Sequence, residues 1–439
     1  MLNNADYQRK FIKVEEVLPL IKTGDQIVSG LGGAEPQAIL SKLHEEADRL
    51  RDVSIITCLP MGNYEFFGNP QYKEAFLMEG WFYSGVMRKL HENKNITFIP
   101  NHLHFASTKR MHYKKPNIYM GNCSPVDQHG YISLGLSNVY EKDMIENADL
   151  VILEVNPNVP RTHGDTSLHY TKVDYFVETN YPLPELPIAE PNEKDMRIGQ
   201  FIADLIEDGS TIQLGIGGIP NAVAQALKTK KHLGIHTEMF TDGMVDLVEC
   251  GAVDNSMKTL HPDKMVAAFA LGTKKLYDFI NDNPGVEIKR GTYVNDPYII
   301  GKNHKMISIN TSIEVDLTGQ CCSESVGTRQ ISGTGGQADT AIGAQNALDG
   351  KSFIALYSTA TLKDKSTGKM VEKSKIVPML TPGAIVSLSR NDVDYVVTEY
   401  GAVQLRGTSV RERVKRLISI AHPSFREELM EEAEKLMLW

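Results

Sequence analysis

The chain has 439 residues, which is too long for one ordinary hydrophobic core and favours two domains of roughly 200 residues each. Its composition, 41% hydrophobic and 23% charged, is typical of a globular protein. The formal net charge of −9 argues against a nucleic-acid or anionic-membrane binder, because such proteins need a basic surface. An anionic small ligand stays possible, since a few lysines and backbone N–H groups can hold phosphates.

The N-terminal segment carries charges throughout and has no uninterrupted apolar core, so we expect no signal peptide. No apolar run approaches the roughly 20 residues that span a bilayer, and we expect a cytoplasmic protein. The cysteines form no CxxC pair and no metal-ligand spacing; they are Cys58, Cys123, Cys250, Cys321 and Cys322. We therefore expect reduced thiols and no bound metal.

The first informative element is a short apolar strand with a glycine-rich turn, GDQIVSGLGG at residues 24–33. It recurs as GSTIQLGIGG at residues 209–218. A proline and a helical pattern follow each copy, in PQAILSKL (36–43) and PNAVAQAL (220–227). Each copy is therefore a βα unit whose turn exposes backbone N–H groups at the N-terminus of a helix.

Three later segments of the first half also have counterparts, in the same order. VSIITCLPMG (53–62) resembles LGIHTEMFTDG (233–243), which places Cys58 opposite Glu238. Two more pairs are NCSPVDQHG (122–130) with NTSIEVDLTG (310–319), and ADLVILEVN (148–156) with VDYVVTEYG (393–401). The last pair places Glu154 opposite Glu399. We predict a duplicated α/β fold with two similar tandem domains, each a mostly parallel sheet flanked by helices.

The proline-rich stretch at 181–195 is the expected linker. We predict one α/β domain over residues 1–185, which forms the acyl side of the site, and a second over 186–439, which supplies the catalytic glutamate and the CoA-binding loops. The polar, lysine-rich segment 362–375 is expected to be an exposed loop or hairpin. Ligands of open parallel sheets bind beyond the C-terminal strand ends, so the cleft between the domains is the expected site.

Two glycine-rich loops in the second half are candidates for binding an anion. The first contains Gly215, Ile216, Gly217, Gly218 and Ile219; the second, SGTGGQAD at 332–339, contains Gly335 and Gly336. Each loop is either a cradle that stabilises an oxyanion or a tight structural turn. The first lacks the GxGxxG spacing and an acidic ribose-binding residue, so a dinucleotide site is disfavoured.

Glu238 is the candidate nucleophile. It follows an apolar stretch and precedes a helical pattern, so we expect it at a strand end. A desolvated carboxylate beside oxyanion donors can attack an activated acyl group. Most glutamates in such turns, however, are surface residues without a catalytic role. Cys58, its counterpart, has no neighbouring histidine in sequence and no feature that predicts a lowered pKa.

At these loops the chain resembles the acetyl-CoA hydrolase/transferase family, and the resemblance covers essentially the whole length. GIGGIPNAV, LGIHTEMFTDG, SGTGGQAD and SRNDVDYVVTEYGAVQLRG carry it. Within the family the chain is most similar to the 4-hydroxybutyrate and butyryl-CoA:acetate CoA-transferases. The resemblance implies a homodimer or homotetramer with no permanently bound cofactor, which takes coenzyme A or acyl-CoA as substrate.

The resemblance also implies roles for single residues. Glu238 matches the nucleophile that becomes a glutamyl-CoA thioester, and the loop from Gly215 to Ile219 matches a turn that contacts CoA. Gly335 and Gly336 match a loop that closes over the thioester. Three more implied site residues are Asn310 near CoA, Glu399 as a second carboxylate, and a CoA-contacting lysine. The register gives Thr361 at the lysine's position, with Lys363 two residues on.

The implied reaction moves CoA between a short acyl-CoA and a carboxylate, with acetate, butyrate and 4-hydroxybutyrate as the expected acids. It proceeds by ping-pong kinetics without ATP, metal or redox cofactor. Residues of the first half such as His163 are weaker candidates for the acyl side, because a lone loop histidine more often packs. Two alternatives remain open: an acyl-CoA hydrolase of the same fold, and a non-catalytic nucleotide-binding module.

Overall fold

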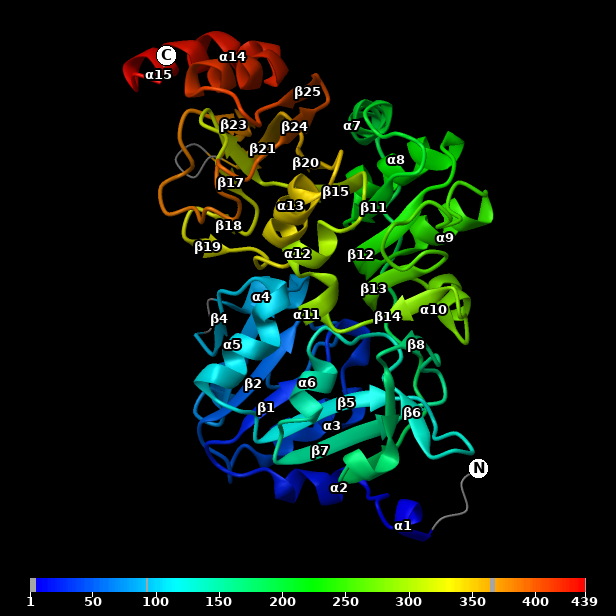
Figure 1. The fold of residues 1–439 in the computed structure, drawn as a ribbon. Helices are drawn as coiled ribbons and strands as arrows, with labels where there is room; N and C mark the ends of the chain where they lie inside the picture. Colours follow the sequence, from blue (N-terminus) through cyan, green and yellow to red (C-terminus); the bar gives the residue numbers. More distant parts are fainter. Residues whose placement is uncertain (1–4, 92–93, 364–367, 439) are drawn as a thin grey trace. The chain divides into compact units, whose positions relative to one another are not determined.

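The computed structural model describes residues 5–91, 94–363 and 368–438. The chain divides into two compact units. Unit 1 comprises Met1–Pro187, Glu238–Asp242 and Lys264–Asn295, and unit 2 comprises Ile188–Thr237, Gly243–Asp263 and Asp296–Trp439. Two large, mostly parallel sheets flanked by helices make up the fold, which confirms the predicted α/β class (Figure 1).

The main sheet of unit 1 has seven strands in the order β10-β7-β5-β1-β2-β3-β4. Their bounds are β1 Gln26–Ser29, β2 Val53–Cys58, β3 Phe76–Phe82, β4 Ile96–Phe98, β5 Ile118–Cys123, β7 Leu150–Val155 and β10 Tyr175–Glu178. Neighbouring residues of one strand enter two different cores: Ile27 lies in one core and Val28 in the other. The strands are apolar almost throughout because both faces of the sheet are covered.

Helices cover both faces of this sheet. Helices α2 (Val14–Val17), α3 (Gln37–Lys42) and α4 (Gly85–Leu90) supply the core that contains Ile27. Helices α5 (Ala106–Tyr113) and α6 (Glu141–Ile145) supply the core that contains Val28. The remaining short elements before the linker are α1 (Ala5–Gln8) and the antiparallel pair β6 (Tyr131–Ser133) and β9 (Ser167–His169).

Segments from later in the chain complete the core of unit 1. They are the end of β12 (Gly234–Phe240), β13 (Met265–Ala270), α10 (Lys274–Ile280), β14 (Val286–Ile288) and α11 (Gly291–Val294). Strand β8 (His163–Gly164) pairs in parallel with β14. Met239, Val266 and Leu271 pack in the same core as Val28 and Ile56. Unit 1 is therefore not continuous in sequence.

Unit 2 contains strands in the order β25-β24-β20-β15-β11-β12. Their bounds are β11 Thr211–Leu214, β15 Met306–Thr311, β20 Lys351–Ala355, β24 Tyr395–Thr398 and β25 Gly401–Gln404, with β25 antiparallel to β24. The helices are α7 Glu193–Asp204, α8 Gly218–Ala226, α9 Asp242–Glu249, α12 Pro297–Ile300, α13 Gln337–Asn346, α14 Val410–Ile420 and α15 Arg426–Lys435. Strand β12 belongs to both units, since its residues up to Thr237 lie in unit 2 and its last residues, from Glu238 on, lie in unit 1.

Short strands decorate unit 2. The small sheet β17-β16-β23 consists of Cys321–Cys322, Glu314–Asp316 and Ile376–Val377, and β18 (Ser325–Val326) pairs with β19 (Arg329–Gln330). The lysine-rich segment forms an antiparallel hairpin of β21 (Thr359–Lys363) and β22 (Met370–Ser374), as predicted. Residues 364–367 of that segment lie outside the described residues.

Strand registers support the duplication. In unit 1 Ile27 of β1 lies beside Ile55 of β2, and in unit 2 Ile212 of β11 lies beside Ile235 of β12. Cys58 and Glu238 each follow three residues after the paired isoleucine. The two residues therefore occupy equivalent places in the two copies, as the sequence comparison predicted.

One predicted equivalence is wrong. Strand β7, which contains Glu154, pairs directly with β5, whereas β20 separates β24 from β15. Strand β24 therefore matches β10, and the correct counterpart of VDYVVTEYG (393–401) is VDYFVETN (173–180). Glu399 is thus not the counterpart of Glu154. Both strands are short and apolar, so sequence likeness could not show which neighbour each strand pairs with.

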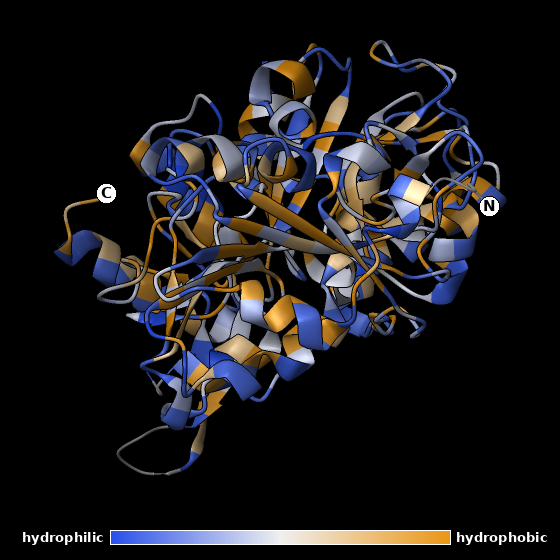
Figure 2. Cartoon of the chain, turned by 90° about the horizontal axis from the view of Figure 1, so that it is seen from below, coloured by the Kyte–Doolittle hydropathy of each residue, from blue (hydrophilic) through white to orange (hydrophobic). Residues whose placement is uncertain are grey.

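Hydropathy follows the layers. In Figure 2 several strands are coloured as hydrophobic along most of their length, whereas the helices carry both hydrophobic and hydrophilic residues. This pattern is typical of helices that pack their hydrophobic face against the sheet and expose their hydrophilic face to water. Among the described residues, no helix combines the length and the apolar character that a membrane crossing needs.

Candidate active site

Glu238 lies inside a strand, two residues before its end. Strand β12 runs to Phe240, and α9 begins at Asp242. The sequence predicted a position at the strand end, and the strand is slightly longer than expected because Met239 and Phe240 are buried apolar residues that continue it. Glu238 itself is half-buried, unlike the fully buried residues before it. The carboxylate thus lies at the C-terminal end of a mostly parallel sheet, where such folds bind ligands.

Asn295 fixes one oxygen of this carboxylate. Its Nδ2 donates a hydrogen bond of 2.8 Å to Glu238 Oε2. Asn295 is only 1% exposed and follows the last residue of α11, where its backbone N–H bonds to Gly291 O. The sequence did not single out this asparagine, because 57 residues separate it from Glu238. An amide in this position orients the carboxylate and can stabilise negative charge on Oε2.

Cys58 lies close to Glu238 but is not suited to be a nucleophile. The thiol is buried, and burial raises its pKa well above the ordinary value; the charges of Glu238 and Glu141 raise it further. A thiol must ionise to attack, and this environment opposes ionisation. The structure thus agrees with the expectation that nothing activates Cys58.

In unit 1 the protein's own carboxylates occupy the N–H groups of the glycine turn. Glu141 Oε1 accepts a hydrogen bond of 3.0 Å from Leu31 N, inside the GLGG turn. Glu141 is fully buried, and burial raises its pKa. A turn that already binds an internal carboxylate cannot offer the same N–H group to a substrate.

In unit 2 the corresponding turn carries no such carboxylate on its N–H groups among the hydrogen bonds of the described residues. Gly217 has a φ of +112°, which only glycine adopts readily, and α8 begins at Gly218. Ile216 is 42% exposed. Asp195 packs against Gly218 so closely that a Cβ there would lie 2.4 Å from Asp195 Oδ2. The turn is therefore open at Ile216 and sterically restricted at Gly218.

Glu399 is the centre of a hydrogen-bonded network in unit 2. Its Oε2 accepts from Ser358 N at 2.8 Å, and its Oε1 accepts from Ser358 Oγ at 2.8 Å and lies 3.2 Å from Lys194 Nζ. The pKa of Glu399 is lowered, because these donors outweigh the effect of burial. Tyr357 Oη, beside this network, donates to Asp195 Oδ1 at 2.7 Å. Glu399 is thus a firmly held carboxylate in the same unit as the Gly215–Ile219 turn.

Two lysines of unit 2 differ in their surroundings. Lys363 lies at the far end of β21 and is exposed, about 16 Å along the strand from Ser358 at roughly 3.3 Å per residue. Lys375 follows the second strand of the hairpin, and its backbone N–H bonds to Ser358 O at 2.8 Å. Burial lowers the pKa of Lys375 to about 8, while the charges of Glu399 and Glu314 favour its protonation. Lys375, not Lys363, is therefore the lysine of the hairpin that interacts electrostatically with Glu399, in addition to Lys194, which forms the ion pair.

The other predicted residues lie in or near the sheet of unit 2. Asn310, half-buried near the end of β15, donates 3.0 Å bonds from Nδ2 to Ser308 Oγ and Thr340 Oγ1. Gly335 is buried with a φ of +54°, and Gly336 precedes α13. In unit 1 His163 lies in the short strand β8, is exposed, and contacts Asp282 at 3.2 Å. The structure thus groups Glu238, Cys58 and Asn295 in one unit and the two glycine loops, Asn310 and Glu399 in the other.

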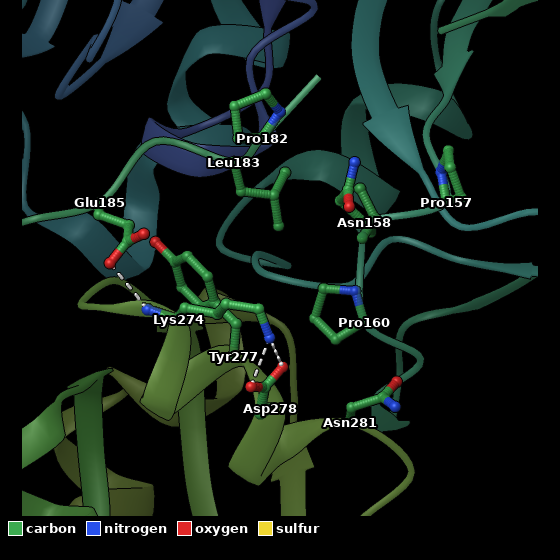
Figure 3. Close-up of a pocket in the computed structure, with 11 residues that line it drawn as sticks. Pro157, Asn158, Pro160, Pro182, Leu183, Glu185, Lys274, Tyr277, Asp278 and Asn281 are labelled. Atoms are coloured by element: carbon green, nitrogen blue, oxygen red, sulfur yellow. Dashed lines mark hydrogen bonds and ion pairs between the residues drawn. The ribbon is translucent and has the colours of Figure 1, made fainter. Parts of the chain in front are cut away.

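Figure 3 shows a hollow of about 260 Å³ in unit 1 that contains none of the predicted site residues. Its lining includes Asn158, Leu183 and Tyr277. Lys274 N donates to Glu185, and Lys274 Nζ pairs with Asp278 (Figure 3). These charges are mutually satisfied, and nothing in this hollow suggests chemistry. Among the described residues, no group of three histidine, cysteine, aspartate or glutamate side chains has the arrangement of a metal site.

Two domain families match the chain. The acetyl-CoA hydrolase/transferase N-terminal domain matches residues 1–187, and the C-terminal domain of the same family matches residues 272–433. The chain belongs to the acetyl-CoA hydrolase/transferase family. Its sequence resemblance to this family is thereby confirmed.

Relatives of known activity cover almost the whole chain. The 4-hydroxybutyrate coenzyme A transferase of Clostridium kluyveri is 43% identical over 430 residues, which is 98% of each protein. The succinyl-CoA:cyclohexane-1-carboxylate CoA transferase of Geobacter metallireducens is 42% identical over 98% of this chain and 96% of that protein. The butyryl-CoA:acetate CoA-transferase of Anaerostipes caccae is 36% identical over 99% of this chain and 98% of that protein.

A solved structure shows the same fold. RipA from Yersinia pestis superposes with a TM-score of 0.89 at 34% identity and covers 99% of both chains. Family and relatives together identify the chain as an acyl-CoA:carboxylate CoA-transferase family enzyme. Two relatives of nearly equal identity act on different acids, so identity alone does not select the substrate pair.

Proposed function

We propose that this enzyme moves CoA between a short-chain acyl-CoA, such as 4-hydroxybutyryl-CoA or butyryl-CoA, and a carboxylate such as acetate, through a glutamyl-CoA thioester on Glu238. The observation that carries the proposal is the hydrogen bond from the buried Asn295 amide to the half-buried carboxylate of Glu238. Three other glutamates of unit 1, Glu35, Glu141 and Glu154, are fully buried, whereas Glu238 is only half-buried and can be reached by a substrate.

The first half-reaction begins with attack of the Glu238 carboxylate on the carbonyl carbon of the acyl thioester. The C–S bond breaks, CoA leaves as a thiolate, and an acyl-glutamyl anhydride forms. The thiolate then attacks the glutamyl carbonyl carbon, the anhydride C–O bond breaks, and the carboxylate product leaves. Glu238 now carries CoA as a thioester, and an incoming carboxylate reverses these steps with its own acyl group.

We propose that Oε1 of Glu238 forms the anhydride, so that each attack on the glutamyl carbonyl carbon places negative charge on Oε2, the oxygen that Asn295 contacts. The amide N–H group is already directed at Oε2, so it needs no rearrangement when charge builds there. We further propose that the Gly215–Ile219 and Gly335–Gly336 loops and Asn310 contact CoA, with Glu399 as a second carboxylate of the site. Lys375 replaces Lys363 in this proposal, because it interacts electrostatically with Glu399.

The substrate pair rests on the relatives' names alone, since the acids they act on range from 4-hydroxybutyrate to cyclohexane-1-carboxylate. The domain assignments, with residues 1–185 on the acyl side and 186–439 carrying the CoA loops, stay predictions. So does a cytoplasmic homodimer or homotetramer.

The direct test is intact-mass spectrometry after mixing the enzyme with butyryl-CoA, followed by peptide mapping. A covalent gain of one CoA at Glu238 is expected. Glu238→Asp withdraws the carboxylate by one methylene, roughly 1.5 Å, so it and Glu238→Ala should be nearly inactive. Steady CoA release without an adduct would instead favour a hydrolase, and no adduct with no turnover of any short acyl-CoA would refute the enzyme assignment.

Asn295→Ala tests the amide. We expect adduct formation to slow about 10- to 100-fold, because a hydrogen bond to a charged group contributes about 1.5–3 kcal/mol. Asn283→Ala is the control: this amide also lies near a helix end in unit 1, but it bonds only to backbone, donating to Phe279 O and accepting from Gly285 N. Equal rates in both variants would contradict the role of Asn295.

A further inference from the structure

Helix α11 is a single turn that carries Asn295 at its end. The helix covers Gly291–Val294, and Asn295 N donates to Gly291 O at 3.0 Å. Among the described residues, the side chain of Asn295 makes one hydrogen bond, from Nδ2 to Glu238, and its buried Oδ1 has no hydrogen-bond partner. The place of this amide therefore depends on where the backbone of α11 lies.

The first residue of α11 packs directly against the loop that precedes α6. Gly291 N donates to Asn138 O and to Val139 O, both at 3.1 Å. A Cβ at Gly291 would lie 2.7 Å from Val139 O, which is too close for a carbon atom beside a backbone oxygen. The loop is itself fixed, because Asn138 N donates to Ala268 O of β13 at 2.9 Å. The start of α11 is thus set by backbone contacts that require a glycine.

Arg290, the residue before α11, binds two carboxylates at the end of α6. Its Nη1 and Nη2 donate to the two oxygens of Glu146 at 3.1 and 2.6 Å, and Nη1 also donates to Asp143 Oδ1. Ser107 Oγ of α5 donates to the other oxygen of Asp143 at 2.7 Å. A guanidinium that binds a carboxylate through two N–H groups is fixed in orientation as well as in distance. Arg290 therefore joins the start of α11 to α6.

We propose that Arg290 is a positioning residue for the reaction: its ion pairs with α6 hold α11 where the Asn295 amide meets Glu238. Among the described residues Arg290 makes no hydrogen bond or ion pair with Glu238, so it acts through the helical turn that leads to Asn295. The inference rests on the proposed function, and it adds α6 to the elements that determine the geometry of the nucleophile.

An ion pair that only stabilises the fold makes a different prediction. A less stable variant contains fewer folded molecules, but each folded molecule reacts at the wild-type rate. Its adduct would therefore reach a lower final amount with an unchanged rate constant. A displaced Asn295 amide instead lowers the rate constant in every folded molecule, because the donor no longer meets the charge that develops on Glu238.

The test measures the rate constant of adduct formation with butyryl-CoA, by a time course of intact mass, in a double-mutant cycle of Arg290→Met and Asn295→Ala. We expect Arg290→Met to lower the rate constant about tenfold, because a misplacement of about 1 Å can cost up to about 100-fold. The double variant should be no slower than Asn295→Ala alone, since Arg290 acts through this amide. Arg290→Lys keeps the charge but loses the paired donors, and its rate constant should lie between those of Arg290→Met and wild type.

Two further variants change the same contacts without removing the arginine. Glu146→Gln, at an exposed residue, weakens two hydrogen bonds to Arg290 and should slow adduct formation about threefold. Gly291→Ala places a methyl group against Val139 O, displaces α11 and should slow adduct formation about tenfold. These variants test the inference if Arg290→Met does not fold.

Arg110→Met is the matched control. Arg110 is also a partly buried arginine of unit 1, but its partners are Glu79 of β3, at 2.8 Å, and Gln26 of β1. None of these contacts reaches α6 or α11. The control should lower the thermal stability and keep the wild-type rate constant of adduct formation.

A wild-type rate constant in Arg290→Met overturns the inference, as does a wild-type rate constant in both Glu146→Gln and Gly291→Ala. Independent losses that multiply in the double variant, or an equal loss in Arg110→Met, also overturn it. Wild-type enzyme that forms no adduct on Glu238 would instead overturn the proposed function.

Discussion

Four glutamates of unit 1 show how environment separates the proposed nucleophile, Glu238, from buried structural groups. Burial raises the pKa of Glu35 and of Glu154 to about 7 and that of Glu141 in the same direction, and each accepts backbone N–H bonds. Such groups hold backbone N–H donors and have almost no exposed surface, so a substrate cannot reach them, and burial disfavours their ionised form. Glu238 keeps partial exposure and is oriented by a side-chain amide. The sequence could propose Glu238 from its motif, but it could not separate these roles by burial.

Lys375 gives a prediction at this scale. Its pKa falls on folding from 10.5 to about 8, so the unfolded chain binds more protons between these values, and wild-type stability should rise with pH across that range. Lys375→Met should therefore raise the free energy of unfolding by about 1–3 kcal/mol at pH 7 and lose most of this advantage by pH 9.5. Thermal unfolding at both pH values measures it.

The control for this experiment is Lys363→Met, in the exposed part of the same hairpin, which should change Tm little at either pH. A Lys375→Met variant that is less stable than wild type at pH 7 would show that electrostatic attraction to Glu399 and Glu314 outweighs the burial of the charge.

At the scale of elements, the two copies conserve an interaction that the sequence pairing missed. Asp174 Oδ2, just before β10, accepts from Val151 N of β7 at 2.8 Å. Asp394 Oδ2, just before β24, accepts from Ser352 N of β20 at 3.1 Å. In each copy an aspartate before the strand thus accepts a hydrogen bond from the second residue of the neighbouring strand. This shared contact makes β24 the equivalent of β10. Only paired strands could reveal this.

The two aspartates should differ in their contribution to stability. Asp394 is fully buried and also accepts from Arg406 and Gln404, whereas Asp174 is exposed. We expect Asp394→Ala to lower stability by about 2–4 kcal/mol and Asp174→Ala by about 1 kcal/mol or less. Thermal melts of the two variants measure the difference, and equal losses would contradict the structural account.

At the scale of the whole molecule, unit 1 is assembled from three separate segments of the chain, so its N-terminal segment should not fold alone. Its core combines β1 and β2 with Met239, β13 and Leu271, which lie beyond the linker. A fragment of residues 1–187 lacks these partners and would expose apolar core residues such as Val28 and Ile56. We expect this fragment to lose its cooperative thermal transition and to be cut rapidly by protease. A fragment as protected as the full chain would show that residues 1–187 are an independent domain.

The sequence alone determined the family, the α/β class, the duplicated βα units and the equivalence of Cys58 and Glu238, because these depend on local patterns of apolar and glycine residues. The tertiary structure alone decided the place of β24, the interaction of Lys375 rather than Lys363 with Glu399, and the contact of Asn295 with Glu238. Each of these depends on which strands pair and which groups lose contact with water. Such contacts join residues far apart in the chain, and no local pattern specifies them.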